Sequence, residues 1–202
     1  MTIKQNELPA IGSAFQGGFF AGLFNIDGQL HGLIVAPKAA GELHEARWGE
    51  YGNDIAGATS VYDGLANTQA MAAEGYPLAK WALELQIDSF TDWYLPSRDE
   101  LEILYRQFKP TTESNYQYGR HGENSSAVPI TQHYSAESPA QTEHEAFQEG
   151  GEEAFGDCWY WSSTQYSPLH AWSQTFGDGF QPIDPKGFEL RARAVRKFTV
   201  TP

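Results

Sequence analysis

Residues 158–181, with the sequence CWYWSSTQYSPLHAWSQTFGDGFQ, decide the fold class of this chain. From 170 to 176, Trp172, Gln174 and Phe176 would lie on one face of an extended strand and the residues between them on the other, which is the period of two of a β-strand. The Gly-Asp-Gly at 177–179 predicts a turn that ends this strand. The stretch is therefore interpreted mainly as the core of a β-sheet.

Two features of this stretch could instead belong to a binding site or a catalytic site. Trp161 and Trp172 could stack on sugar rings, but large aromatic residues at strand spacing mostly fill cores, and we assign both to the core. Ser162, Ser163 and Thr164 could be a nucleophile cluster. Because no G-x-S-x-G motif surrounds them, we interpret them instead as groups that satisfy the backbone at a strand end.

Other strands are predicted near both ends of the chain. Residues 19–26 and 30–36 are apolar runs separated by Asp27-Gly28, a dipeptide typical of tight hairpin turns, so we predict a buried β-hairpin. Near the end, FELRARAVRKF (188–198) alternates apolar residues with arginines and predicts a closing strand. Its alternation is regular only as far as Ala194.

Helical spacing fills the region between these strands. Residues 64–87 predict two helical pieces separated at 75–77, with Pro77 in the first turn of the second piece. A further helix begins after Pro96, because Ser97 can cap it and Glu100 completes a capping box. Its apolar stripe consists of Leu101, Leu104, Tyr105 and Phe108.

Residues 109–157 form a long polar segment, which we call the acidic excursion. It contains nine acidic residues against Lys109 and Arg120, and it is too poor in aliphatic residues to build a core of its own. We predict a surface insertion in a single domain that spans residues 1–202. The sequence leaves open whether the segment is a contact surface or a solvated loop.

The charge and the cysteine count restrict the partners. The chain has 26 acidic and 13 basic residues, and its net charge of -13 repels nucleic acid and anionic membranes. The single Cys158 cannot form an internal disulfide. The first residues lack the apolar run of a signal peptide, and nowhere do about 18 apolar residues follow one another. We therefore expect a protein that neither inserts into membranes nor leaves the cell by that route.

Five segments in a fixed order carry a resemblance: FQGGFFAGLFNIDGQLHGLIVA (15–36), DGLANT (63–68), WYLPSRDELEILY (93–105), YWSSTQY with AWSQTFGDG (160–179), and RARAVRKF (191–198). Together they resemble the Lcl C-terminal domain family, which is found on bacterial surface proteins and in many phage genomes. The resemblance implies an α+β, C-type-lectin-like fold with paired terminal strands, two helices and a small second sheet that carries the Trp-Ser-Ser segment. The acidic excursion departs from the family pattern.

That family is similar in turn to the variable receptor-binding proteins of diversity-generating phages and to formylglycine-generating enzymes, which share an exposed binding face built from loops. We expect the loops at 116–121, 166–170 and 180–184 to form this face. Tyrosine and arginine supply binding energy at low entropic cost, and Tyr134 is another such residue in the excursion. The candidate ligand-binding residues are Tyr116, Tyr118, Arg120, His121, Tyr166, His170, Phe180 and Gln181.

No catalytic residue, metal or cofactor is expected. Formylglycine-generating enzymes use a pair of cysteines, whereas Cys158 is single and has no basic neighbour in sequence to stabilise a thiolate. The six histidines lack zinc-site spacing. Calcium ligands could come from Glu123, Asn124, Asp178 and Asp184, but no EF-hand spacing or sugar-lectin motif is present, and we interpret these groups as solvated.

Domains of the family that the chain resembles usually act outside the cell, yet no signal peptide, membrane segment or disulfide is expected here. The resemblance therefore implies a phage structural protein of the tail tip, baseplate or fibre, located in the virion after synthesis in the host cytoplasm. It would be a non-catalytic binding module for a host surface glycan or protein, or for neighbouring virion subunits, and the related phage proteins suggest a homotrimer. Two alternatives stay open: a purely architectural capsid or tail decoration protein, and an enzyme of the formylglycine-generating type.

Overall fold

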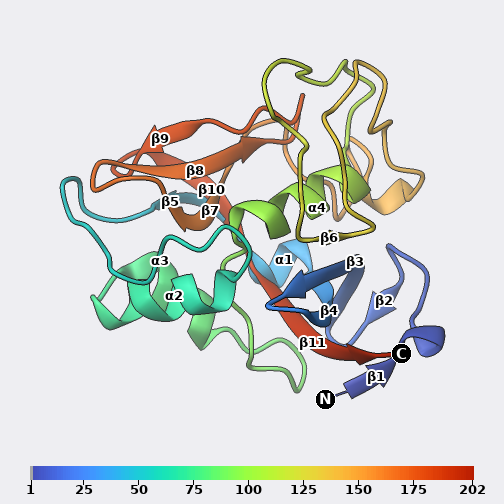
Figure 1. Ribbon diagram of the computed structural model, residues 1–202, viewed down its shortest axis with the longest axis horizontal. Coiled ribbons are helices and arrows are strands. Elements are labelled where there is room, and N and C mark those ends of the chain that lie inside the picture. Colours follow the sequence, from blue (N-terminus) through green and yellow to red (C-terminus); the bar gives the residue numbers. More distant parts are fainter. Residues whose placement is uncertain (1) are drawn as a thin grey trace.

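The computed structural model describes residues 2–202, in which two β-sheets and four α-helices are arranged around α4 (Figure 1). The first sheet has the order β1-β11-β4-β3-β2, with β6 paired to β3, and the second has the order β5-β10-β7-β8-β9. The predicted α+β class is confirmed, but the described residues hold four helices where the resemblance implied two.

The first sheet consists of β1 (Thr2–Lys4), β2 (Ala14–Phe15), β3 (Gly18–Ile26), β4 (Gln29–Val35), β6 (Ala127–Val128) and β11 (Val195–Thr201). The second consists of β5 (Glu42–Arg47), β7 (Trp159–Gln165), β8 (His170–Thr175), β9 (Ile183–Pro185) and β10 (Glu189–Arg193). The helices are α1 (Lys38–Gly41), α2 (Gly64–Ala73), α3 (Pro77–Glu84) and α4 (Arg98–Phe108), with 3-10 turns η1 (Gln5–Glu7) and η2 (Glu145–Phe147).

The predicted hairpin is confirmed as β3 and β4. Asp27 and Gly28 both have positive φ, 49° and 84°, as a tight turn between twisted strands requires. The terminal strands pair as expected, because β1 runs parallel to β11 with Ile3 opposite Val200. The first sheet therefore joins the two ends of the described chain.

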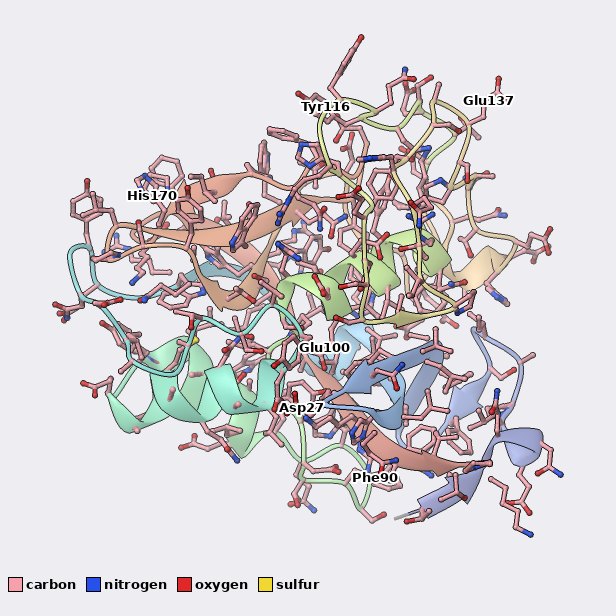
Figure 2. All side chains as sticks on the ribbon, viewed as in Figure 1. Asp27, Phe90, Glu100, Tyr116, Glu137 and His170 are labelled. Atoms are coloured by element: carbon pink, nitrogen blue, oxygen red, sulfur yellow. The ribbon has the colours of Figure 1, made fainter. Side chains whose placement is uncertain are left out.

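The N-terminus of α4 is fixed by the capping box that the sequence predicts. The Ser97 hydroxyl accepts a hydrogen bond from the Glu100 backbone N–H at 3.3 Å, and the Glu100 carboxylate accepts one from the Ser97 N–H at 2.7 Å. That carboxylate also accepts from the Tyr94 hydroxyl at 2.5 Å and from the Gly64 N–H at 3.0 Å. Figure 2 shows Glu100 between α4 and α2, where burial raises its pKa. One carboxylate thus joins two helices.

The predicted closing strand is wrong in one respect, because it is two strands that belong to different sheets. The change occurs at Ala194, whose backbone bonds to Gly41 and Ala36 instead of to a strand partner. Before it, Arg193 is fully buried and donates hydrogen bonds to the Ala36 carbonyl and to the carboxylate of Glu153. The alternation of apolar residues with arginines is regular only up to Ala194, and this local break does not by itself show that the chain passes from one sheet to the other.

The acidic excursion is an integral part of the domain. Phe147 stacks on Phe108 with ring centroids 4.0 Å apart, and Phe155 stacks on Phe176 at 3.9 Å. In Figure 1 its loops, yellow to orange, lie over α4. Tyr134 is also buried, so its side chain does not belong to a contact surface.

Glu102 of α4 attaches the excursion through side-chain hydrogen bonds. Its carboxylate accepts from Asn124 at 2.9 Å and from the Tyr134 hydroxyl at 3.2 Å, both in the excursion, and from Arg106 at 2.9 Å. Burial raises the pKa of this carboxyl group. The polar network therefore positions the loops that carry half of the candidate residues.

Candidate functional site

Two loops that are distant in sequence are joined at Asp178. Its backbone carbonyl accepts from the Tyr116 N–H at 2.8 Å, and its carboxylate accepts from the Phe180 N–H at 3.0 Å. Gly179 has a φ of +79°, and a Cβ there would lie 2.3 Å from the Tyr105 ring. The turn at 177–179, which the sequence predicts, therefore places Tyr116 and Phe180 side by side.

An aromatic cluster forms at this junction, and it consists of Tyr116, Tyr118, His121, Trp159 and Phe180. The Phe180 ring centroid lies 4.5 Å from that of Tyr116, 5.0 Å from that of His121 and 6.1 Å from that of Trp159. Tyr118 packs edge-on against Tyr116 and is 70% exposed. Four of the eight candidate residues thus meet at one exposed patch.

His121 and Gln181 hold the two loops together. The Gln181 backbone N–H donates to His121 Nδ1 at 3.2 Å, and the Gly122 N–H donates to the Gln181 side chain at 3.4 Å. Burial lowers the pKa of His121, and the charge of Arg120 lowers it further. A neutral imidazole suits its acceptor role. Gln181 is itself buried, so its side chain supports the loops and does not face solvent.

A second cluster consists of Arg98, Arg120, Tyr166 and Trp172. The guanidinium carbons of Arg98 and Arg120 lie 5.4 and 5.8 Å from the Trp172 ring centroid, and Tyr166 packs edge-on at 5.5 Å. Arg98 is held by two hydrogen bonds to Asp99. The assignment of Trp172 to the core is wrong, because this side chain is only half-buried; Trp161 is fully buried, as predicted.

The two clusters are linked through Arg120, which adjoins His121 in the chain. His170, at the start of β8, is half-buried and lies 3.4 Å from the Ser167 hydroxyl in the adjoining turn. Figure 2 shows Tyr116 and His170 on the upper side of the molecule, away from Asp27 and Phe90. We call the two clusters together the recognition face. It combines aromatic surface with guanidinium groups, a combination that suits sugar rings and protein side chains.

The side chains at 162–164 form hydrogen bonds with backbone groups, as predicted. The hydroxyls of Ser162, Ser163 and Thr164 donate to the carbonyls of Trp172, Pro96 and Ser60 at 2.9, 3.2 and 2.8 Å. All three side chains are buried. Their hydroxyl protons are thus used in structural hydrogen bonds.

Cys158 has a basic neighbour that sequence order could not reveal. Burial raises the pKa of its thiol, and the nearby Arg191 opposes this to a smaller extent. The net effect favours the thiol over the reactive thiolate at neutral pH.

The four groups considered as calcium ligands make separate interactions. Glu123 pairs with His133 at 3.0 Å, and Asn124 donates to Glu102. Asp178 caps its turn, and Asp184 accepts from Ser173 at 2.5 Å. Within residues 2–202, no three His, Cys, Asp or Glu side chains gather as a metal ion would require. The same residues contain no helix with the length and apolar character needed to cross a membrane.

Sequence reasoning missed Arg98 as part of the recognition face. Its position directly after the N-cap Ser97 marked it only as the first residue of a helix. No local signal indicates that β8 brings Trp172 against that helix end, because the contact joins residues 74 positions apart.

The family model for the Lcl C-terminal domain matches residues 43–196, which is most of the chain and includes α4, the excursion and the recognition face. No curated protein sequence matches it.

Proposed function

Since the chain belongs to the Lcl C-terminal domain family, we propose that it is a non-catalytic binding module of a phage virion. Its place would be the tail tip, the baseplate or a fibre. There it would contact a glycan or protein of the host surface, or a neighbouring virion subunit. The proposal includes a C-type-lectin-like scaffold and assembly as a homotrimer.

The observation that carries this proposal is the recognition face. Partly exposed aromatic rings and two guanidinium groups lie together where the loops of Tyr116 to His121 and of Phe180 meet α4, β7 and β8, and buried polar networks anchor the excursion that carries the first of these loops. Aromatic and arginine side chains dominate binding energy at protein interfaces, and preordered loops lose little entropy on binding. The most exposed of these side chains, Tyr118 at 70% and Tyr166 at 56%, bury little surface within the domain itself.

In the proposed mechanism, one part of the molecule is a rigid platform and another part contacts the ligand. The sheets and α4 form the platform, and the recognition face provides the contact. The affinity of one site can be modest, because repeated copies on a particle raise avidity by a factor of roughly 100 to 10,000.

Mass spectrometry of purified phage particles tests the virion role. We expect the protein among the structural components of the particle. Its absence from washed particles, together with its presence in uninfected cells, would refute that role.

A second candidate is architectural, as a capsid or tail decoration protein. It is favoured by exposed apolar side chains outside the recognition face, with Ile130 at 64% and Phe188 at 53% exposure. Exposed apolar side chains gain free energy when a neighbouring subunit covers them. Deletion of the gene separates the two functions, because particles without a decoration protein would still adsorb to the host at the normal rate.

A further inference from the structure

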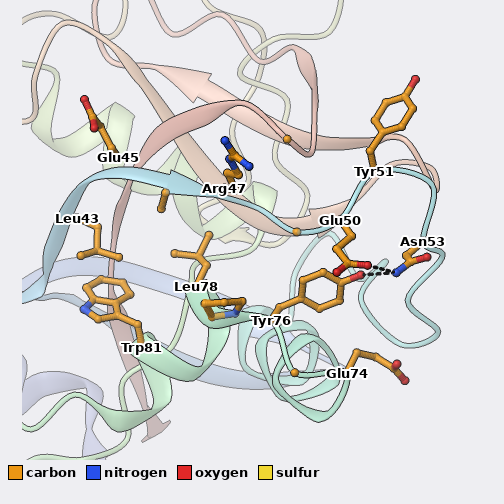
Figure 3. A pocket seen from close by; sticks show the side chains of 15 residues that line it. Leu43, Glu45, Arg47, Glu50, Tyr51, Asn53, Glu74, Tyr76, Leu78 and Trp81 are labelled. Atoms are coloured by element: carbon orange, nitrogen blue, oxygen red, sulfur yellow. Dashed lines mark hydrogen bonds between the residues drawn. The ribbon is translucent and has the colours of Figure 1, made fainter.

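A groove of about 910 Å³ lies between β5 and the segment that joins α2 to α3, outside the recognition face. Figure 3 shows its apolar floor, formed by Leu43 of β5 and by Leu78 and Trp81 of α3. Tyr76 lines it next to Pro77 at the start of α3. Leu78 is buried, whereas Trp81 and Leu43 are half-buried and remain accessible to a ligand.

One end of the groove has fixed polar groups. The Asn53 side chain donates to the Tyr76 hydroxyl at 3.2 Å and to the Glu50 carboxylate at 3.0 Å, as the dashed lines in Figure 3 show. These bonds join the segment after β5 to the start of α3. The hollow is therefore formed before any ligand binds.

The groove runs along an open sheet edge. Among the strands of residues 2–202, β5 pairs only with β10, so its other side has no strand partner. An open edge presents backbone N–H and C=O groups in the spacing that an extended peptide can match. This feature favours an extended peptide over a helix or a sugar.

The charge around the groove specifies the peptide further. Glu45, Glu50 and Glu74 line it, and the charge of Arg47 is balanced by Glu189, whose carboxylate lies 3.2 Å away. Among residues 2–202, no Lys, Arg or His side chain forms an ion pair with any of these three carboxylates, which are exposed along the groove. A ligand with positive side chains complements them, and one with acidic side chains is repelled.

We propose that the groove binds an extended segment of a partner protein in which basic residues alternate with apolar ones. The segment adds a strand to β5, its apolar side chains cover Trp81 and Leu78, and its basic side chains reach Glu45 and Glu74. β5 and β9 are opposite edges of the second sheet. A partner on β5 therefore leaves the loop between β8 and β9, which carries Phe180, free for other contacts. This inference does not depend on what the recognition face binds.

The test uses two blocked peptides, Lys-Val-Lys-Leu-Lys-Val and Glu-Val-Glu-Leu-Glu-Val, added to the ¹⁵N-labelled protein. We expect the basic peptide to shift the backbone amide signals of β5 and the Trp81 indole signal, and the acidic peptide to shift neither. The variant E45K/E74K should weaken binding of the basic peptide about tenfold or more. The matched control Glu137→Lys reverses an exposed charge in the excursion and should bind like the wild type.

Two further measurements separate strand addition from other modes. A basic peptide with alternate backbone nitrogens methylated keeps its charge but loses hydrogen-bond donors, and we expect it not to bind. Equal binding of the methylated peptide, equal binding of the acidic peptide, or shifts confined to other surfaces would overturn the proposal. Sedimentation that shows a dimer lost in E45K/E74K would also overturn it, in favour of pairing between two copies of β5.

Discussion

Replacing Arg193 with methionine tests whether the acidic excursion and the two sheets are one cooperative unit. In the folded protein the guanidinium donates to the Ala36 carbonyl at 2.9 Å, to the Glu153 carbonyl at 2.7 Å and to the Glu153 carboxylate. Methionine keeps much of the apolar stem but removes every donor. The carboxylate, with its side chain only 11% exposed, then retains the Lys38 N–H at 2.7 Å as its hydrogen-bond donor.

The loss of one partner from a buried ion pair costs about 3–5 kcal/mol, because the other charge stays buried without compensation. We therefore expect Arg193→Met to lower the free energy of unfolding by about 3–5 kcal/mol, roughly a fifth or more of the stability typical of a domain. Urea unfolding followed by tryptophan fluorescence and by circular dichroism measures it. Both probes should report one shared transition.

Arg47 on the neighbouring strand β5 is the matched control. Its side chain is 68% exposed and lies 3.2 Å from the carboxylate of Glu189, which is 53% exposed, so Arg47→Met should cost about 1 kcal/mol or less. Adding Glu153→Gln to Arg193→Met removes the uncompensated charge, and the cycle should show a coupling of roughly 0.5–3 kcal/mol. Equal effects of the two arginine replacements, or a loss below about 1 kcal/mol for Arg193→Met, would refute the reasoning.

Three further changes test other parts of the account by the same unfolding assay. Ser97→Ala removes the cap of α4 and should cost about 1–2 kcal/mol, whereas a neutral effect would mean that the capping box is dispensable. Gly179→Ala should lower the free energy of unfolding by about 2 kcal/mol or more, and by more than Gly28→Ala does. Both glycines have positive φ, but only at Gly179 would the added Cβ meet an aromatic ring. The pKa of His121 is lower in the folded protein than its usual 6.5. As the pH falls, the unfolded chain therefore binds a proton at this residue before the folded protein does, and the free energy of unfolding should decrease below about pH 6.5. The decrease should be less steep in His121→Asn, and identical pH profiles of the two proteins would contradict this.

Local patterns predicted the elements whose determinants are local. The hairpin follows from Asp27-Gly28 and its apolar flanks, and α4 follows from Ser97 and Glu100, whose reciprocal bonds span three residues. The hydroxyls at 162–164 were interpreted correctly for a similar reason, because the absence of a nucleophile motif is visible in a short window.

Features set by long-range pairing were not predictable. Arg193 looks like one solvent-facing arginine in an alternating strand, and only the fold brings Glu153 against it. Phe147 and Phe155 stand in a polar segment, and their burial depends on Phe108 and Phe176 from elsewhere in the chain. Trp172 has strand spacing like that of a core residue, but it lies on the side of the sheet where Arg98 and Arg120 leave it partly open.

The candidate site was only partly accessible to sequence reasoning. Tyr116, Tyr118, His121 and Phe180 were chosen for their residue types, and the turn at Asp178 brings them together. The groove along β5 gave no signal, because the helices and the strand that line it are separated by loops without any recognisable motif.

Competition for phage adsorption tests the central proposal most directly. Host cells are preincubated with the free recombinant protein, and the adsorption rate of the phage is measured. The wild type should slow adsorption, and so should the control Phe188→Ala, which removes an exposed aromatic side chain outside the recognition face. The variant Y118A/Y166A, with both side chains more than half exposed in the wild type, should keep the same melting temperature but compete at least about tenfold less well. Failure of the wild type to compete, or equal competition by Y118A/Y166A, would contradict a role of the recognition face in host attachment.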